Sequence, residues 1–394
     1  MSGASVVSMR RRRAGMGGSP MGWATLALSA LLLAGCARGP APVVFHAEGY
    51  PARLSDWNVV YRDGDRLALN ERVVPFDLNT PLFSDYAHKL RTMWLPEGTS
   101  ARYEPREAFD FPVGTILSKT FFYPVAAGEN GVARTDDTSR DHAGEGLDLR
   151  NVRMVETRLL VRRQQGWIAL AYVWNAAQTE ATLERTGASV PLQLVAADGS
   201  REPFTYQVPD QNQCAGCHAS NNTTREIKPL GPKARHLNKD YAYATGSENQ
   251  LAHLVELGYL HDVPATGVPR NADWRDAANA SLDGRARAYL DINCGHCHNP
   301  EGPADTSGLW LDSFDRDPRH LGLCKPPVAA GQGTGGHRFG IVPGQPDESI
   351  LAYRMDSDDP GVMMPELGRD VVHREGVALV REWIAAMDGD CEQD

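Results

Sequence analysis

Between residues 48 and 209 the chain alternates short apolar runs with polar, turn-rich stretches and has no long helical periodicity. The runs are rich in Thr, Val, Phe, Tyr and Trp, which suit a pleated, half-buried surface. They predict strands at residues 115–123, 155–161, 166–174 and 189–195. Short strands between turn signals are typical of an antiparallel β sandwich or small barrel, so we expect a mainly-β domain. The polar residues 128–147 predict a long mobile loop.

From residue 210 onward the pattern changes to helical spacing and irregular loops. Ser247 to Gln250 form a candidate capping box for a helix that ends at Leu260. Further helices are predicted over residues 282–293 and about 371–387, where apolar residues recur at core spacing. We therefore expect a multidomain chain: a β-rich domain at 48–209 and two mainly-α units at 210–281 and 282–394.

The N-terminus has the pattern of an export leader. Arg10 to Arg13 are basic, and an apolar run continues from about Trp23 to Leu33. This run of about 14 residues is shorter than the ~20 that span a bilayer. Leu33-Ala34-Gly35-Cys36 resembles the bacterial lipobox, which implies removal of residues 1–35 and lipidation of Cys36.

Residues 36–47 would then be a linker. Because Ala37 rather than Asp follows the cysteine, the lipoprotein resemblance also implies the periplasmic side of the outer membrane. An ordinary cleaved signal with an incidental cysteine is the alternative.

Charge narrows the range of partners. The chain has 40 basic and 50 acidic side chains, and without the four leader arginines the balance is 36 to 50, a net charge of −14. A strongly acidic surface argues against nucleic-acid binding and against tight binding to anionic lipid. It is compatible with docking to basic redox proteins.

Two copies of one five-residue pattern indicate the chemistry. Cys214-Ala215-Gly216-Cys217-His218 and Cys294-Gly295-His296-Cys297-His298 both read C-x-x-C-H, the attachment signature of c-type haem. The two thiols bond the haem vinyl groups, and His218 or His298 becomes the proximal iron ligand. We expect two covalently bound haem c groups. Zinc is the alternative for two C-x-x-C pairs.

The cysteine count leaves one pair over. Of seven cysteines, four belong to the haem motifs and Cys36 to the leader, which leaves Cys324 and Cys391. An exported chain enters an oxidising compartment, so a Cys324–Cys391 disulfide is the simplest assignment. It would stabilise the fold by roughly 4 kcal/mol on the chain-entropy model. Two buried free thiols are the alternative.

The second motif is followed by a candidate sixth iron ligand. The order of helix, C-x-x-C-H, irregular middle, Met-Pro loop and terminal helix over residues 282–390 resembles a class I cytochrome c domain. That resemblance implies Met364, directly before Pro365, as the distal ligand, with Met363 as the fallback. A methionine ligand raises the iron potential and suits one-electron transfer. Ordinary apolar packing of the two methionines is the alternative.

The first motif has no such methionine. None occurs between Met154 and Met355. His236 and His253 are candidate ligands, and a five-coordinate iron or a ligand from elsewhere in the chain are the other possibilities. An open iron could bind peroxide or another small molecule.

Beyond these units, the whole chain resembles a bacterial family of dihaem c-type cytochromes with an N-terminal β-rich extension. The segments that carry this resemblance are Leu78 to Tyr86, Glu156 to Leu160, Tyr172 to Asn175, Pro229 to Lys233 and Leu237 to Asp240. The resemblance implies the domain order and the dihaem content but no particular reaction.

These observations favour an exported lipoprotein that transfers single electrons between redox proteins of the cell envelope. One alternative is a dihaem peroxidase or haem oxidase with the first haem as an open reaction centre. Another is a β domain that recruits a partner. We expect redox protein partners, a membrane contact through the lipid on Cys36, and no nucleic acid.

Overall fold

The fold is mainly β, unlike the predicted arrangement of one β domain and two mainly-α cytochrome units. In the computed structural model 27% of the residues are in strands and 19% in helices. The structure describes residues 7–9, 40–219, 221–328 and 330–391. Residues 42–394 form one compact unit. The predicted fold class is therefore wrong.

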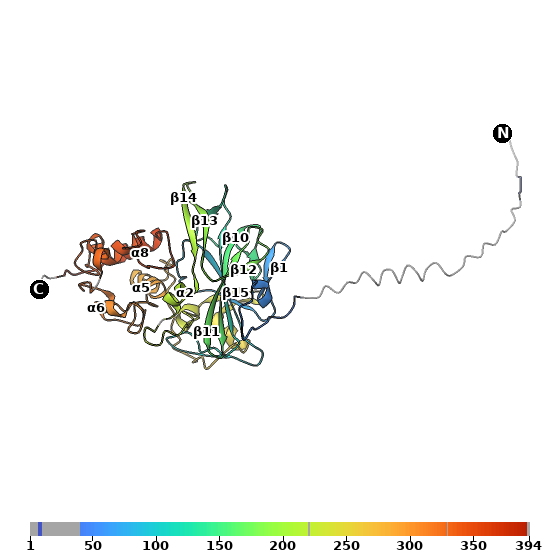
Figure 1. Cartoon of the computed structure of the whole chain (residues 1–394), viewed down its shortest axis with the longest axis horizontal. Helices are drawn as coiled ribbons and strands as arrows, with labels where there is room; N and C mark the ends of the chain where they lie inside the picture. Colours follow the sequence, from blue (N-terminus) through green and yellow to red (C-terminus); the bar gives the residue numbers. More distant parts are fainter. Residues whose placement is uncertain (1–6, 10–39, 220, 329, 392–394) are drawn as a thin grey trace, which may run out of the picture. The chain divides into compact units, whose positions relative to one another are not determined.

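A six-stranded antiparallel sheet is the largest element of the fold (Figure 1). The strands predicted at residues 115–123, 155–161 and 166–174 are confirmed within it. In spatial order the sheet consists of β12 (Ala181–Glu184), β11 (Gly166–Trp174), β10 (Val152–Arg163), β6 (Ile116–Pro124), β4 (His88–Trp94) and β3 (Val74–Phe76).

One face of this sheet is mostly buried. Phe122, Leu159 and Tyr172 on this face pack against Trp57 and Leu67 in one apolar cluster. Tyr172 also accepts a hydrogen bond from the Trp57 indole (2.7 Å). This face faces the core of the β-rich part of the chain.

The opposite face, which we call the site face, combines apolar and charged residues. At one end Leu117 belongs to a cluster with Phe76 and Leu254, and at the other Phe121 packs with Tyr206. Between the two ends the cross-strand row is charged, as described below.

Smaller sheets complete the β structure. A four-stranded sheet contains β1 (Val60–Asp63), β2 (Arg66–Leu69), β9 (Gly146–Asp148) and β8 (His142–Ala143). A three-stranded sheet contains β14 (Arg201–Val208), β13 (Ala188–Val195) and β7 (Gly131–Ala133). Two short pairs are β15 (Asp240–Tyr243) with β16 (Gly246–Asn249), and β17 (Leu260–His261) with β5 (Ala101–Arg102).

Two loop and cap predictions are wrong for the same reason, strand pairing. Residues 128–147 are not one long loop, because β7 pairs with β13, β9 pairs with β2, and β8 pairs with β9. Ser247 does not open a helix, because β16 pairs with β15 in a hairpin. Asn249 caps the following helix instead by accepting from the Leu251 N–H (3.0 Å).

The helices are short. Those in the described residues are α2 (Gln211–His218), α3 (Ala234–Leu237), α4 (Gln250–Glu256), α5 (Leu282–Asn293), α6 (Pro318–Leu321), α7 (Ile350–Met355) and α8 (Arg374–Ala385). Single 3-10 turns occur at Leu54–Trp57, Asp305–Ser307, Gly331–Thr334 and Pro346–Glu348. The prediction at 282–293 is confirmed by α5, and α8 occupies the middle of the predicted 371–387 helix.

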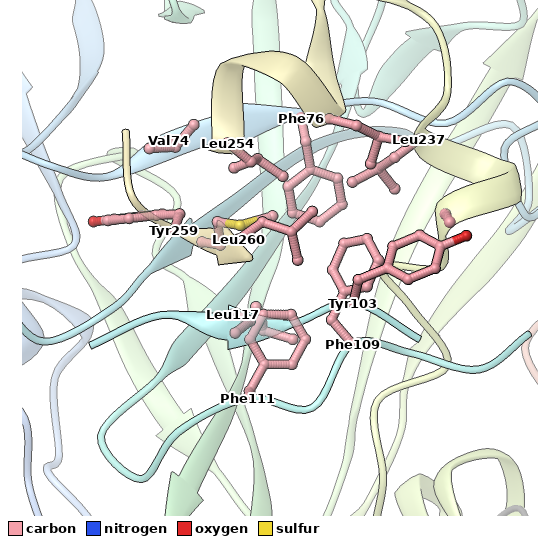
Figure 2. Packing of buried hydrophobic residues seen from close by; sticks show 14 of the residues in the cluster. Val74, Phe76, Tyr103, Phe109, Phe111, Leu117, Leu237, Leu254, Tyr259 and Leu260 are labelled. Atoms are coloured by element: carbon pink, nitrogen blue, oxygen red, sulfur yellow. The ribbon is translucent and has the colours of Figure 1, made fainter. Parts of the chain in front are cut away.

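Residues 210–281 form no α unit of their own because their apolar side chains complete the β core. Figure 2 shows Leu237, Leu254 and Leu260 packed with Phe76 and Leu117 in one cluster. Leu260 also lies in β17, which pairs with β5 in parallel. Burial against an existing sheet removes these side chains from water more effectively than a separate small core would.

The C-terminal helices pack on one another. Trp383 and Val380 of α8 pack with Leu290 of α5, and Ala352 of α7 joins them. The Trp383 indole donates to Asp283 at the start of α5 (3.0 Å). In Figure 1 these helices form the orange and red part of the chain. They support the second C-x-x-C-H motif.

Candidate functional site

The first motif lies on the short helix α2. Asp210 caps this helix by accepting from the N–H groups of Asn212 (2.7 Å) and Gln213 (2.8 Å). Cys214 and Cys217 are three residues apart, so they share one helix face. Both thiols are free and partly exposed. Because the cap fixes the start of α2, the helix holds the two free thiols side by side.

His218 ends α2 with a defined orientation. Its Nδ1 lies 2.8 Å from the Lys228 carbonyl oxygen. Because a carbonyl can only accept, Nδ1 carries the proton and Nε2 presents its lone pair. Burial, reinforced by the charge of Lys119, lowers the pKa of His218 to about 3, which keeps the ring neutral. A neutral imidazole with a free Nε2 is the form that binds a metal.

The second motif follows α5 directly. Cys294 caps the end of α5, and Cys294 and Cys297 are both free and partly exposed. Gly295 lies so close to the backbone that an added Cβ would be 2.8 Å from the Asp291 carbonyl oxygen. A glycine is therefore required inside this motif.

His298 reaches the same tautomer through a different partner. Ser307 donates its hydroxyl proton to the Ala304 carbonyl (2.6 Å), so its oxygen accepts from His298 Nδ1 (3.0 Å). Nε2 again keeps its lone pair. Burial lowers the pKa of His298 to about 4. In the described part of the chain we find no hydrogen bond to Nε2 of either motif histidine.

The donor set of each motif therefore fits haem c. Two free thiols lie next to an imidazole whose Nδ1 is already held, as in metal-binding histidines with an ordered outer shell. Within the described ranges, no group of three or more His, Cys, Asp or Glu side chains gathers around a common point. Haem iron needs only one or two axial protein ligands, because the porphyrin supplies the others.

The two motifs lie next to each other, a feature that their separation in sequence does not predict. Asn222 donates its N–H to the Glu301 carbonyl (2.7 Å), and the Asn221 amide donates to the Glu301 carboxylate (2.8 Å). Asn221 follows His218 by three residues, and Glu301 follows His298 by three. The loops that follow the two motif histidines are thus hydrogen-bonded together.

The loop with Met364 lies at both motifs. A Cβ added to Gly216 of the first motif would meet the Leu367 side chain at 2.8 Å. The charge of Glu366 acts on Cys297 of the second motif. Met363 is buried, whereas Met364 is partly exposed. Of the two methionines, Met364 is thus the more accessible to a bound group.

Arg369 holds this loop and was not predicted from the sequence. Its buried guanidinium donates to the carbonyls of Met364 (3.0 Å), Ser357 (2.7 Å) and Val371 (3.3 Å). The Met364 N–H in turn donates to the Arg354 carbonyl (2.9 Å). Nothing in the sequence distinguishes an arginine that holds a loop in this way from an arginine that is exposed to solvent.

The two other candidate ligands have different partners. His236 is buried, and its Nε2 lies 3.2 Å from the Asp291 carboxylate. The ring of His253 stacks on Tyr243 at a centroid distance of 3.6 Å, and its Nδ1 bonds to Glu248 (2.7 Å). Among the described contacts, neither histidine touches the first motif.

The remaining cysteines divide between the structure and the leader. Cys324 and Cys391 are joined by a disulfide. The predicted leader, with Cys36, lies outside the described residues apart from positions 7–9. Over the part of the chain that the structure describes, no helix has the length and apolarity to cross a bilayer.

Comparison with known proteins identifies no relative. No family model matches the chain, and no curated protein or solved structure matches it.

Proposed function

We propose that this protein is a dihaem c-type cytochrome that transfers single electrons between redox proteins. The observation that carries the proposal is the same in both motifs: two free thiols beside a histidine whose Nδ1 is held and whose Nε2 is free. Chance C-x-x-C-H sequences would have no reason to share this arrangement through two unrelated partners.

The attachment chemistry needs only residues of the two motifs. Each thiol adds across one haem vinyl group: a sulfur–carbon bond forms, and the thiol proton passes to the other vinyl carbon. Four thioether bonds would use Cys214, Cys217, Cys294 and Cys297. A bound haem would supply one-electron redox chemistry, and His218 and His298 would hold its iron.

At the second haem, Met364 is the proposed distal ligand. The Arg369 guanidinium holds the Met364 carbonyl and so limits the motion of the loop. A thioether ligand favours the reduced iron and leaves no open coordination position. This site would exchange electrons without binding a substrate.

The contact between the motif loops supports electron passage from one haem to the other. A reduced donor protein would lose one electron to one haem, and the other haem would pass it to an oxidised acceptor protein. Lipidation of Cys36 would tether this exchange to the periplasmic side of the outer membrane. The acidic net charge would favour partners with basic docking surfaces.

A second candidate is a haem peroxidase or oxidase that uses the first haem as its reaction centre. It is favoured by one observation: His236 is bonded to Asp291 and His253 is stacked on Tyr243, so neither is held ready at the first motif.

The haem content of the exported protein tests the proposal. We expect two haems per chain by pyridine haemochrome, with a matching increase in mass after denaturation. The variant Cys214→Ser/Cys217→Ser should keep one haem, and Cys294→Ser/Cys297→Ser should keep the other. Protein without covalent haem from cells that mature c-type cytochromes would overturn the proposal.

Carbon monoxide distinguishes the two candidate functions. If both irons of the reduced protein resist carbon monoxide, electron transfer is supported. Rapid binding at the haem that survives in Cys294→Ser/Cys297→Ser, together with turnover of peroxide, would establish the enzyme instead.

A further inference from the structure

We propose that Lys119 and Arg158 on the site face bind a propionate carboxylate of the haem attached at Cys214 and Cys217. This inference rests on the proposed function, because it concerns the haem of the first motif. It assigns a role to a charged row that the fold alone does not require.

The row runs across the middle of the site face. Arg91 on β4 lies directly opposite Lys119 on β6, and Lys119 lies directly opposite Arg158 on β10. The row on one side contains Leu117, and the row on the other side contains Phe121 between Lys89 and Glu156. Like charges directly opposite one another destabilise a sheet. Three adjacent cations therefore need a counter-charge.

The described carboxylates do not balance the row. Arg91 pairs with Asp77 (3.1 Å), and Arg158 binds the buried Glu156 through Nε (2.9 Å) and Nη2 (2.5 Å). Glu156 also accepts from the Tyr206 hydroxyl (2.7 Å) and Asp77 also pairs with Lys239 (3.1 Å).

Lys119 is the unmatched cation of the row. Among the described residues its amine makes no hydrogen bond or ion pair. It lies over the Phe121 ring, 5.1 Å from the ring centroid. Lys89 and Arg158 lie over the same ring, at 5.6 Å and 4.3 Å. Burial and the neighbouring positive charges lower the pKa of Lys89 and bring the pKa of Lys119 to about 7, so the positive charge around this ring is incompletely balanced.

The row leads to the first motif. The next residue across the sheet from Arg158 is Ala171 on β11. Ala171 and Cys214 line one small cavity where α2 meets β11. Cys217 interacts electrostatically with Lys119, and Cys214 interacts electrostatically with Arg158. A haem bonded to these thiols would thus lie against the charged part of the site face.

The chemistry of the two cations suits a carboxylate. Among the residues that the structure describes, the Lys119 amine has no hydrogen-bond partner, and Arg158 retains Nη1 after its bonds to Glu156. Its side chain is 28% exposed although β10 lies between β6 and β11, so the row is open to a ligand. Charge-assisted bonds to a carboxylate are among the stronger hydrogen bonds in proteins.

The test compares Lys119→Gln, Lys119→Arg and a charge-matched control, Arg62→Gln, in the haem-loaded protein. Arg62 lies on β1 in another sheet and is exposed. Haem content is measured first, and the Cys214→Ser/Cys217→Ser variant identifies which potential belongs to the first haem. Spectroelectrochemistry then gives both potentials, and resonance Raman spectra report the propionate bending modes.

Loss of the cation should favour the ferric form of the first haem. We expect Lys119→Gln to lower its equilibrium constant for reduction about tenfold, which is about 59 mV for one electron. The propionate bending mode should shift as well. Lys119→Arg should restore both readouts, and Arg62→Gln should change neither.

Several results would overturn the inference. One is an unchanged first-haem potential in Lys119→Gln. Another is a shifted potential with an unchanged propionate mode, which would mean that the charge acts from a distance. A first-haem potential in the parent that changes when phosphate replaces chloride would assign the row to a free anion. Absence of haem from the parent would overturn the proposed function itself.

Discussion

At the level of single residues, the two motif histidines reach one chemical state by different means. His218 donates a hydrogen bond to a backbone carbonyl. His298 donates one to the Ser307 hydroxyl, which itself donates to the Ala304 carbonyl. In both cases the partner determines the tautomer and leaves Nε2 available. The sequence identifies these two histidines, but it does not identify the groups that orient them.

The distal methionine can be identified by comparing neighbours. Met364→Ala should abolish the thioether-to-iron charge-transfer band of one ferric haem and lower its potential, because the sulfur ligand favours ferrous iron. Met363→Ala should keep the band but destabilise the fold by about 2–5 kcal/mol, because Met363 is buried. Near-infrared absorption and urea unfolding measure the two effects; loss of the band in Met363→Ala alone would reverse the assignment.

At the level of elements, a buried ion pair ties α3 to α5. Arg235 of α3 donates to both carboxylate oxygens of Asp291 of α5 (2.7 and 2.8 Å), and both side chains are almost fully buried. Asn271 adds a third donor (2.5 Å). The network uses His236 as a structural partner, which explains why this histidine is a poor candidate for an iron ligand.

This network should make the free energy of unfolding depend on pH in the acidic range. Burial alone would raise the pKa of Asp291, but hydrogen bonds from Arg235 and His236 hold it far below its usual range. Because the folded pKa lies below the unfolded value, the stabilisation is present above about pH 4 and is lost as the pH falls further.

Asp291→Asn should reduce the free energy of unfolding at neutral pH by about 3–5 kcal/mol, since it leaves Arg235 buried without its counter-charge. It should also flatten the loss of stability below about pH 4. Urea unfolding between pH 3 and pH 7 measures both, with the exposed Asp262→Asn as control. An acid slope equal to that of the parent would contradict the assignment.

At the level of the whole molecule, residues 42–394 form one compact unit. Helical residues after 210 pack on the sheet that precedes them, and the Met364 loop meets the first motif as well as the second. The site is therefore assembled from distant segments, and the Cys324–Cys391 disulfide ties the C-terminal end to this assembly.

Removal of the disulfide tests how far stability and haem binding are independent. Cys324→Ser/Cys391→Ser should lower the free energy of unfolding by about 2–4 kcal/mol, because the unfolded chain gains freedom. Both haems should remain, because the motif cysteines are separate from this pair. Urea unfolding and haemochrome measure the two effects; loss of one haem, or no change in stability, would contradict this expectation.

Local patterns predicted local structure well. Alternating apolar residues identified β6, β10 and β11, and helical spacing identified α5, because those signals depend only on neighbouring residues. The two C-x-x-C-H motifs could also be recognised from the sequence, since a thiol pair and a histidine are adjacent in it. The fold class was wrong because periodicity does not show which surface an apolar face will cover.

The sequence by itself identified the two C-x-x-C-H motifs on which the proposed haem chemistry rests, and several of the strands and helices around them. Only the tertiary structure decided how those elements combine. It joined the two motif loops through Glu301, bonded His236 to Asp291, and placed the Arg91–Lys119–Arg158 row next to the first motif. The reason is physical: thioether bonds and axial ligands require particular residue types, whereas packing and charge balance depend on contacts between residues far apart in the chain.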